Sequence, residues 1–334
     1  MESRRPLVYY THWCPPEGPD LLAPTCDVHT RAAGEAASRE QVVDGAREAL
    51  ALCYFVPDLV DDALIAALPR LRVLAGFGKG YDNVDVAAAT RRGVWVTNVP
   101  DALTESTADL AWSLLLALAR KTVAGDAFVR GGGFDGWHPR RLLGRRVHGS
   151  VLGIWGFGSI GRAIARRAAG FGMTVLYHDP VRTPDGVERE LHARYAERDE
   201  LLRAADHVVL CFPLTDATRG AVGARELALM RRGTALINVA RGSVVDEDAV
   251  AAAVAAGGIA GYAADVFALE DRQYDDRPGG IPAALLAQRE RSVLTPHLGT
   301  GVLADRVELA RAQALNVLDA LAGRRPRGAV NDVA

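Results

Sequence analysis

Apolar and polar residues alternate along this chain with two different periods, and the two periods take turns from one end to the other. Short runs rich in β-branched and other apolar residues predict strands. These runs are Val73–Phe77, Val94–Thr97, Val151–Trp155, Thr174–Tyr177, His207–Cys211 and Ala235–Val239. Most are followed within a few residues by the spacing of an amphipathic helix, as in Arg162–Ala169 and Ala249–Ala256. Such alternation predicts parallel sheets with right-handed crossovers.

Two further stretches depart from this alternation. Leu110–Ala119 is the most apolar run of the chain, but it has about half of the ~20 residues needed to span a bilayer. It therefore predicts a buried helix. Glu270–Ala283 combines acidic residues with Pro and Gly and has little periodicity, which predicts a loop or lid.

Composition narrows the class of protein. A chain of 334 residues is long enough for two domains. It is 49% hydrophobic and 24% charged, with a net charge of −2, and this balance argues against a nucleic-acid-binding protein. The arginine pairs Arg140–Arg141 and Arg145–Arg146 are interpreted as a solvated face.

The cysteines and the N-terminal residues indicate the compartment. The cysteines have neither paired spacing nor histidine partners at metal-ligand intervals; they are Cys14, Cys26, Cys53 and Cys211. We expect reduced thiols and no metal site, which fits a cytoplasmic protein. Residues 1–6 are charged and precede no apolar core, so no signal peptide is predicted.

The sharpest motif is a set of three glycines between a predicted strand and a predicted helix. Gly156 permits a tight turn, Gly158 lets the backbone approach a pyrophosphate, and Gly161 lets the helix pack on the strand. Ser159 and Ile160 open the helix, whose N-terminal N–H groups favour phosphate. The spacing alone is also found in ordinary turns.

A carboxylate at the end of the next strand makes this motif more specific. Asp179 lies 18 residues after Gly161, where an acidic residue accepts hydrogen bonds from adenosine ribose hydroxyls and repels a 2′-phosphate. We therefore predict NAD rather than NADP as the cofactor. Arg182, three residues further on, is the one nearby residue that favours a phosphate.

Three residues in the second half of the chain are candidates for the chemistry. Arg241 directly follows the predicted strand Ala235–Val239, and in an open parallel sheet ligands bind beyond the carboxyl ends of the strands. A guanidinium binds a carboxylate or a phosphorus oxyanion through two hydrogen bonds. By itself, an arginine in this position is more often a partner in a surface ion pair.

His297 lies between Pro296 and Gly299, in a segment that cannot be helical. Histidine suits general acid–base catalysis because it titrates near neutral pH. Glu270 is the candidate carboxylate that orients the ring and favours its imidazolium form. A single histidine is often structural, but the other seven have no comparable sequence context.

Taken together and in this order, these segments resemble the D-2-hydroxyacid dehydrogenase family. They are the glycine turn, Asn-x-x-Arg-Gly ending at Gly242, Asp-Val-Phe-x-x-Glu ending at Glu270, and Thr-Pro-His-x-Gly ending at Gly299. The resemblance implies that Arg241 binds the substrate anion, that His297 is the acid or base, and that Glu270 tunes it.

The same resemblance implies the layout and the remaining cofactor contacts. Residues 1–101 with 297–334 would form a flavodoxin-like substrate-binding domain, and residues 102–296 an NAD-binding Rossmann domain. Both would be doubly wound parallel α/β sheets. The residues where the family contacts the cofactor correspond to Thr107, Pro213, Ala240 and Asp265. The family is commonly homodimeric, with Leu110–Ala119 in a helix that packs against the partner.

Within the family the chain most resembles the phosphite (phosphonate) dehydrogenases. The loop that begins Gly78-Lys79-Gly80 has a lysine where most relatives have a small apolar residue. Phosphite carries up to two negative charges near neutral pH, so a second cation beside Arg241 would help to hold it. The resemblance also implies that Trp137 and Thr300 contact the substrate. Oxidation of phosphite to phosphate, with hydride transfer to NAD, is therefore the expected reaction.

Several positions depart from the phosphite dehydrogenase pattern. Val56 replaces a methionine, Leu142 replaces an aromatic hydroxyl residue, and Thr300 replaces a serine. Arg140 and Arg141 add positive charge to the stretch that follows Trp137. These changes also fit a larger anion, such as phosphonopyruvate reduced to phosphonolactate, or an ordinary D-2-hydroxy acid.

An alternative of a different class is an NAD-sensing corepressor that binds peptides. Some proteins of this fold act in that way and keep the arginine, glutamate and histidine, so these residues do not exclude it. The lysine loop argues for an enzyme instead, and NADH formation with a defined small anion would separate the two classes.

Overall fold

The computed structural model describes residues 5–333 and divides the chain into two compact units. One unit takes in the chain up to Leu103 together with the stretch from Thr300 onward, and the other is Thr104–Gly299. The sequence predicted a division after residue 101 and again before residue 297. Residues 297–299 fall in the second unit because the backbone N–H groups of Leu298 and Gly299 both donate to the carboxylate of Asp265. Of the six residues used to argue against a signal peptide, the first four lie outside the described part.

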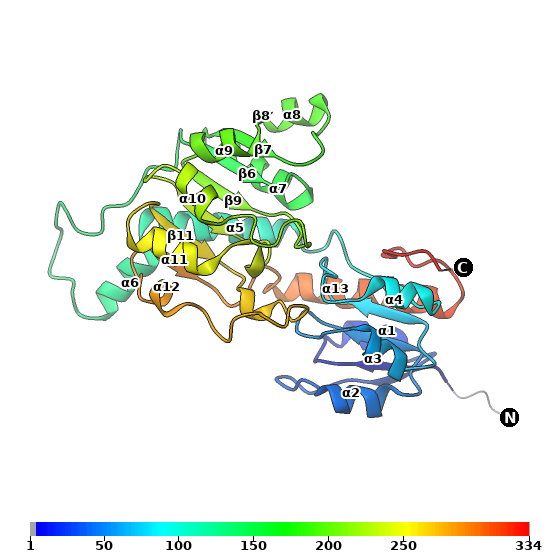
Figure 1. The fold of residues 1–334 in the computed structure, drawn as a ribbon. Helices are drawn as coiled ribbons and strands as arrows, with labels where there is room; N and C mark the ends of the chain where they lie inside the picture. Colours follow the sequence, from blue (N-terminus) through cyan, green and yellow to red (C-terminus); the bar gives the residue numbers. More distant parts are fainter. Residues whose placement is uncertain (1–4, 334) are drawn as a thin grey trace. The chain divides into compact units, whose positions relative to one another are not determined.

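The first unit is built on a five-stranded parallel sheet with strand order β2-β1-β3-β4-β5 (Figure 1). This is the flavodoxin-like order. Its elements are β1 Leu7–Tyr10, α1 Glu17–Leu22, β2 Asp27–His29, α2 Arg39–Ala46, β3 Ala51–Tyr54, α3 Asp62–Ala67, β4 Val73–Gly76, α4 Val86–Arg91, β5 Trp95–Thr97 and α13 Leu303–Leu321.

Neighbouring residues on these strands face opposite sides of the sheet, which gives the unit two cores. Leu52 and Leu74 pack with residues of α2, α3 and α4, whereas Cys53 and Ala75 pack with residues of α1 and α13. Helix α13 is also held by a hydrogen bond from Gln313 Nε2 to the Ala75 carbonyl, 2.8 Å long. This packing explains why the C-terminal stretch joins the N-terminal sheet.

The second unit contains a seven-stranded parallel sheet with strand order β12-β11-β10-β9-β6-β7-β8. The order reverses at β6, as in a Rossmann sheet. Its elements are α5 Thr104–Arg120, α6 Thr122–Arg130, β6 Val151–Trp155, α7 Ser159–Ala168, η1 Ala169–Phe171, β7 Thr174–His178, α8 Asp185–Leu191, β8 Ala193–Tyr195, α9 Arg198–Ala204, β9 His207–Leu210, α10 Ala224–Leu229, β10 Ala235–Asn238, η2 Gly242–Val244, α11 Glu247–Ala255, β11 Gly261–Ala264, η3 Ala268–Glu270, α12 Ala283–Leu286 and β12 Ser292–Leu294.

The strands of this sheet are buried on both faces, as expected for a parallel sheet. Ile237 packs with residues of α5 and α7, and its neighbour Leu236 packs with residues of α9, α10 and α11. The predicted buried helix at Leu110–Ala119 is confirmed, because it lies within α5 and joins the first of these cores. Within residues 5–333 no helix is both long and apolar enough to cross a membrane.

All six predicted strands are present, with ends within a residue of those expected. The pattern missed several strands, namely β1, β2, β3, β8, β11 and β12. These have three or four residues each. The predicted loop at Glu270–Ala283 is irregular between η3 and α12.

Candidate active site

The three glycines form the turn between β6 and α7 in the second unit. Gly156 has φ +96°, and a Cβ there would lie 2.7 Å from the backbone of Cys211 and Phe212. A Cβ at Gly161 would lie 2.2 Å from the Gly156 carbonyl oxygen. At Gly158, by contrast, a Cβ would meet no atom within 4 Å, and no side chain caps the N-terminus of α7. The turn therefore fits a pyrophosphate, which would approach Gly158 and the first N–H groups of α7.

Asp179 directly follows β7 and lies against the glycine turn. One carboxylate oxygen accepts a hydrogen bond from Phe157 N (2.7 Å), and the other accepts one from Val181 N (3.2 Å). Arg182 is engaged elsewhere, because its guanidinium makes two 2.9 Å hydrogen bonds to Glu188. These bonds hold the pKa of Glu188 down at about 2. The arrangement favours a ribose diol over a 2′-phosphate at Asp179.

Asp179 is expected to make the protein prefer NAD over NADP by at least tenfold in kcat/KM, or about 1.4 kcal/mol. Asp179→Ala should narrow this ratio, because the variant loses both the ribose acceptor and the charge that repels phosphate. Asp179→Asn is the matched control, since it keeps an oxygen for Phe157 N but not the charge. Equal use of both cofactors by the unaltered protein would contradict this role.

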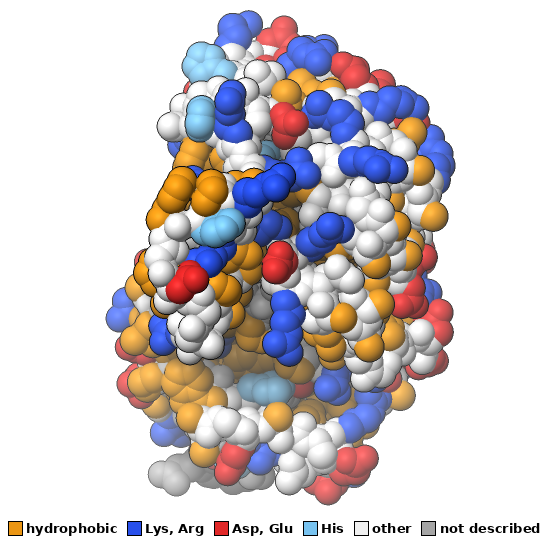
Figure 2. Space-filling model, turned by 90° about the vertical axis from the view of Figure 1, so that its left-hand side faces the viewer, with side chains coloured by type: hydrophobic (Ala, Val, Ile, Leu, Met, Phe, Trp, Pro, Cys, Tyr) orange, Lys and Arg blue, Asp and Glu red, His pale blue; other side chains and the backbone are white. Residues whose placement is uncertain are grey.

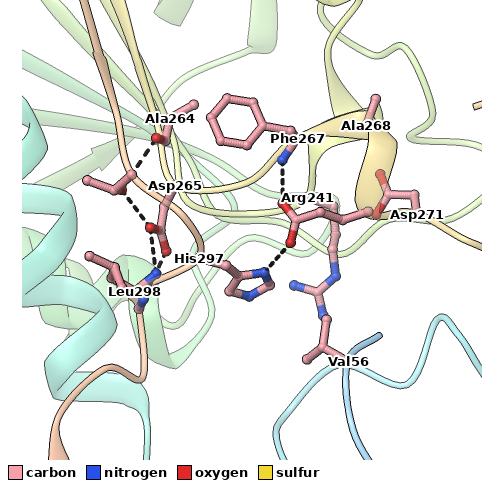
Figure 3. A network of polar contacts seen from close by, with 12 residues as sticks. Val56, Arg241, Ala264, Asp265, Phe267, Ala268, Asp271, His297 and Leu298 are labelled. Carbon is pink, nitrogen blue, oxygen red and sulfur yellow. Dashed lines mark hydrogen bonds and ion pairs between the residues drawn. The ribbon is translucent and has the colours of Figure 1, made fainter. Parts of the chain in front are cut away.

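His297 and Glu270 form a hydrogen-bonded pair. His297 Nδ1 lies 2.7 Å from Glu270 Oε2, and Glu270 Oε1 accepts a hydrogen bond of 2.7 Å from Phe267 N (Figure 3). Both side chains are a little over one-quarter exposed. A carboxylate at Nδ1 fixes the orientation of the ring and leaves Nε2 to exchange a proton.

The backbone of His297 is held in an unusual conformation. Its φ is +56°, which is uncommon for a residue other than glycine. Asp265 holds the segment in place: its backbone oxygen accepts from His297 N (2.8 Å), and its buried carboxylate accepts from Leu298 N, Gly299 N and Thr295 Oγ1. Conformations of this kind occur at functional sites when surrounding bonds fix them.

Arg241 follows strand β10, which pairs with β11 in the same sheet. The side chain of Asn238, the last residue of β10, accepts from Ala240 N (3.0 Å) and donates to the Arg241 carbonyl (2.8 Å). Asn238 thereby sets the direction in which the chain leaves the strand.

The remaining cofactor candidates of the second unit lie at the carboxyl edge of the same sheet or in α5. Pro213 follows β9, Ala240 follows β10 and Asp265 follows β11. Thr107, in α5, donates from Oγ1 to the Gly299 carbonyl at 3.5 Å. The structure thus brings the predicted cofactor residues of this unit to one edge, where doubly wound sheets bind ligands.

The lysine loop lies at the carboxyl edge of the sheet in the first unit. The Lys79 carbonyl accepts from Asn98 Nδ2 at 2.8 Å, and the Gly78 carbonyl accepts from Val99 N at 2.7 Å. Asn83 donates to the carbonyl of Asp58 at 2.7 Å and so joins this loop to the one that carries Val56. Gly80 lies between Lys79 and Asn83, the residues whose hydrogen bonds hold the loop. Thr300, in the same unit, accepts at its backbone oxygen from Arg306 Nε.

Trp137 lies in the irregular stretch between α6 and β6 of the second unit, and its side chain is 87% exposed. Leu142, in the same stretch, has φ +46°. Arg141 is not simply solvated, because it donates to Asp135 and to the Gly136 carbonyl. Among the described residues, no hydrogen bond or ring contact joins Trp137 to Arg241, Glu270 or His297.

Sequence reasoning gave no role to Asn238, Glu247 or Asp271, which support these segments. Each is almost fully buried. Asn238 could have been noticed as an amide that ends an apolar strand, and Glu247 as a carboxylate at the start of an apolar helix. Within residues 5–333, no group of three or more His, Cys, Asp or Glu side chains is placed to hold a metal ion.

The sheet of the second unit is doubly wound, with a glycine turn where the strand order reverses and a histidine–glutamate pair at the same edge. This combination defines a class of dinucleotide-dependent oxidoreductases. Residues 112–299 match the family described as "D-isomer specific 2-hydroxyacid dehydrogenase, NAD binding domain". The chain is 40% identical over 331 residues to a glyoxylate reductase of Thermococcus gammatolerans, which covers 98% of this chain and 96% of the relative. A glyoxylate reductase of Pyrococcus horikoshii is 39% identical with the same coverage.

Solved structures of the same kind of enzyme are also similar to this chain. An NADPH-dependent glyoxylate/hydroxypyruvate reductase of Sinorhizobium meliloti, in complex with NADP and malonate, superposes with a TM-score of 0.84 at 30% identity, covering 98% of this chain and 97% of that one. A D-lactate dehydrogenase of Aquifex aeolicus, complexed with NAD and lactic acid, has a TM-score of 0.79 at 26% identity and 95% coverage of both chains. The chain belongs to the D-isomer specific 2-hydroxyacid dehydrogenase family, and its cofactor is a nicotinamide dinucleotide.

Proposed function

We propose that this protein is an NADH-dependent reductase of a small 2-oxo acid, with glyoxylate or hydroxypyruvate as the first candidate. The observation that carries the proposal is the His297–Glu270 pair, with Nδ1 and Oε2 2.7 Å apart. The turn with Glu270 adjoins the segment that follows Arg241. The glyoxylate reductases that share about 40% of its residues support the same substrate class.

The chain's own residues have three roles in this proposal. Arg241 binds the substrate carboxylate through its guanidinium. His297 donates the Nε2 proton to the carbonyl oxygen, so that an alcohol forms instead of an alkoxide. Glu270 orients the ring and stabilises the imidazolium before that transfer. A bound dinucleotide supplies the hydride that reaches the carbonyl carbon, and the product is the 2-hydroxy acid.

Phosphite oxidation, the reaction expected from the sequence, is the second candidate. One specific observation favours it: Lys79 stands in a loop held at both flanks, at the carboxyl edge of the sheet in the first unit. In that reaction His297 would take a proton from water attacking phosphorus, and Arg241 and Lys79 would bind the oxyanion. The glyoxylate reductases among the relatives support the 2-oxo acid instead, and for that reason we propose phosphite only as the second candidate.

Lys79→Ala is expected to impair oxidation of phosphite more than oxidation of D-glycerate. Two unit charges about 4 Å apart interact by about 4 kcal/mol at an effective dielectric constant near 20. Losing half of that interaction would lower the ratio of the two kcat/KM values roughly thirtyfold, because phosphite has the larger charge. NADH formation with each substrate measures this ratio.

Lys79→Arg is the matched variant, and it should restore part of the ratio because it keeps the charge on a bulkier side chain. An equal fall on both substrates would mean that Lys79 does not discriminate by charge. Phosphite would then lose the observation that favours it.

We also propose that the protein forms a homodimer through α6 and the stretch that follows it. No residue of α6 is buried, although the helix carries apolar side chains. The exposed apolar residues of this segment are Val123, Val129, Phe134, Trp137 and Leu143. Figure 2 faces the side on which this segment lies in Figure 1, and it shows hydrophobic side chains among basic ones at the surface. Sedimentation velocity would then give a mass twice the 35.6 kDa of the chain.

A further inference from the structure

Glu247 is a buried carboxyl group that the proposed reaction does not use. It lies at the first residue of α11 and is 6% exposed. Its Oε1 accepts a hydrogen bond of 2.8 Å from Ala268 N, and its Oε2 has no hydrogen-bond partner among the described residues. Burying a carboxyl group is costly, so its position here requires a reason.

The hydrogen bond from Ala268 fastens the turn that carries Glu270. Ala268 is the first residue of η3, and Glu270 is the third. A second bond, of 2.7 Å, joins Asp271 at the far end of the turn to Ser243 N. Ser243 belongs to η2, which directly follows Arg241. The turn with Glu270 is thus tied at one end to α11 and at the other to the segment of Arg241.

The surroundings of Glu247 favour its neutral form. The acidic groups close to it are Asp248 on its own helix, Asp271 and Glu270 at the turn, and the phenol of Tyr262 on β11. Burial raises the pKa of Glu247, the hydrogen bond from Ala268 N lowers it, and the neighbouring carboxylates raise it further, so that the pKa lies above its usual value. A neutral carboxyl still accepts from Ala268 N and adds no second negative charge beside Glu270.

We propose that Glu247 is a positioning residue, whose carboxyl group holds the turn that presents Glu270 to His297. This inference rests on the proposed roles of Glu270 and His297. It assigns Glu247 no contact with substrate or cofactor. Its effect reaches the reaction only through the orientation of the His297 ring.

The protonation of Glu247 has a consequence for stability that can be measured separately. The folded carboxyl holds its proton more tightly than the unfolded one, which titrates near 4.5. The free energy of unfolding that this group contributes therefore falls as pH rises above 4.5. Glutamine has no proton to lose, so the unfolding midpoint of Glu247→Gln should rise relative to that of the unaltered protein as pH increases above 4.5.

The decisive comparison is between Glu247→Ala and Glu247→Gln. The alanine variant loses the acceptor for Ala268 N, so we expect kcat to fall about tenfold or more. The titration midpoint of the His297 ring, followed by NMR, should fall too, because its carboxylate partner is no longer held. The glutamine variant keeps a neutral acceptor and should keep both values. If Glu247→Ala fails to fold, Glu247→Asp, whose carboxyl is one methylene shorter, replaces it.

Glu226→Ala is the matched control, because Glu226 is also a buried carboxyl in the first turn of a helix of this unit. It accepts from Gly223 N and pairs with Arg225 instead of a site residue. It should lower the unfolding midpoint and leave kcat and the His297 midpoint unchanged. The proposal would be overturned if Glu247→Ala kept the original kcat and His297 midpoint. It would also be overturned if kcat and the midpoint fell equally in the alanine and glutamine variants. The NMR readout needs no turnover, so it separates this inference from a failure of the proposed substrate.

Discussion

Replacing His297 with alanine should lower turnover at least about 100-fold while NADH still binds. The imidazole is proposed to exchange the proton through Nε2, whereas the dinucleotide is expected to be held by the glycine turn and Asp179. Steady-state kinetics and fluorescence titration with NADH measure the two effects separately. A variant that turns over at the original rate would rule out His297 as the acid or base.

Glu270→Gln is the companion variant. It keeps an oxygen that can accept from Phe267 N, but it removes the negative charge 2.7 Å from His297 Nδ1. The pH–rate profile should therefore shift toward lower pH, since the imidazolium loses its charged partner. Substitution of a residue that only supports the fold would lower the rate at every pH without moving the profile.

Gly242→Ala should have the second large effect, on stability and on turnover together. A Cβ at Gly242 would lie 1.8 Å from the carbonyl carbon of Phe267 and 1.9 Å from Ala268 N. Both are backbone atoms that no side-chain rotation can move, so η2 and η3 must separate. We expect a loss of about 3 kcal/mol in the free energy of unfolding and a fall in turnover of about 100-fold.

Gly170→Ala is the control for Gly242→Ala, because a Cβ at Gly170 would meet no atom within 4 Å. Its free energy of unfolding should stay within about 0.5 kcal/mol of the original value. Chemical denaturation and kcat measure both variants. Normal turnover in Gly242→Ala would show that the close approach of the two turns is not needed for the reaction.

His297→Ala and Gly242→Ala illustrate which parts of the candidate site could be predicted from the sequence and which could not. His297 and the glycine turn were identifiable because their signals are local: a proline and a glycine flank the histidine, and three glycines occur at a fixed spacing. Gly242 and Glu247 owe their roles to Phe267 and Ala268, more than 20 residues further along the chain. No short pattern records which backbone atoms will meet after folding.

The fold was predictable for a similar reason. Fully buried parallel strands such as β9 and β10 stand out as apolar runs, and their alternation with helices determines the architecture. The strands β3 and β11 are just as buried, but they were missed because they contain no Val, Ile or Thr. Substrate specificity could not be predicted in the same way, because single side chains set it on a shared fold. Lys79 is the side chain proposed here, and its expected effect depends on the charge of the ligand.

The most direct test of the account compares two reactions of the unaltered protein in one buffer: reduction of glyoxylate with NADH, and oxidation of phosphite with NAD. NADH absorbance follows both. The proposed function predicts a kcat/KM for glyoxylate at least tenfold above that for phosphite, a difference of about 1.4 kcal/mol in transition-state stabilisation. A higher kcat/KM for phosphite, with little or no reduction of glyoxylate, would contradict it.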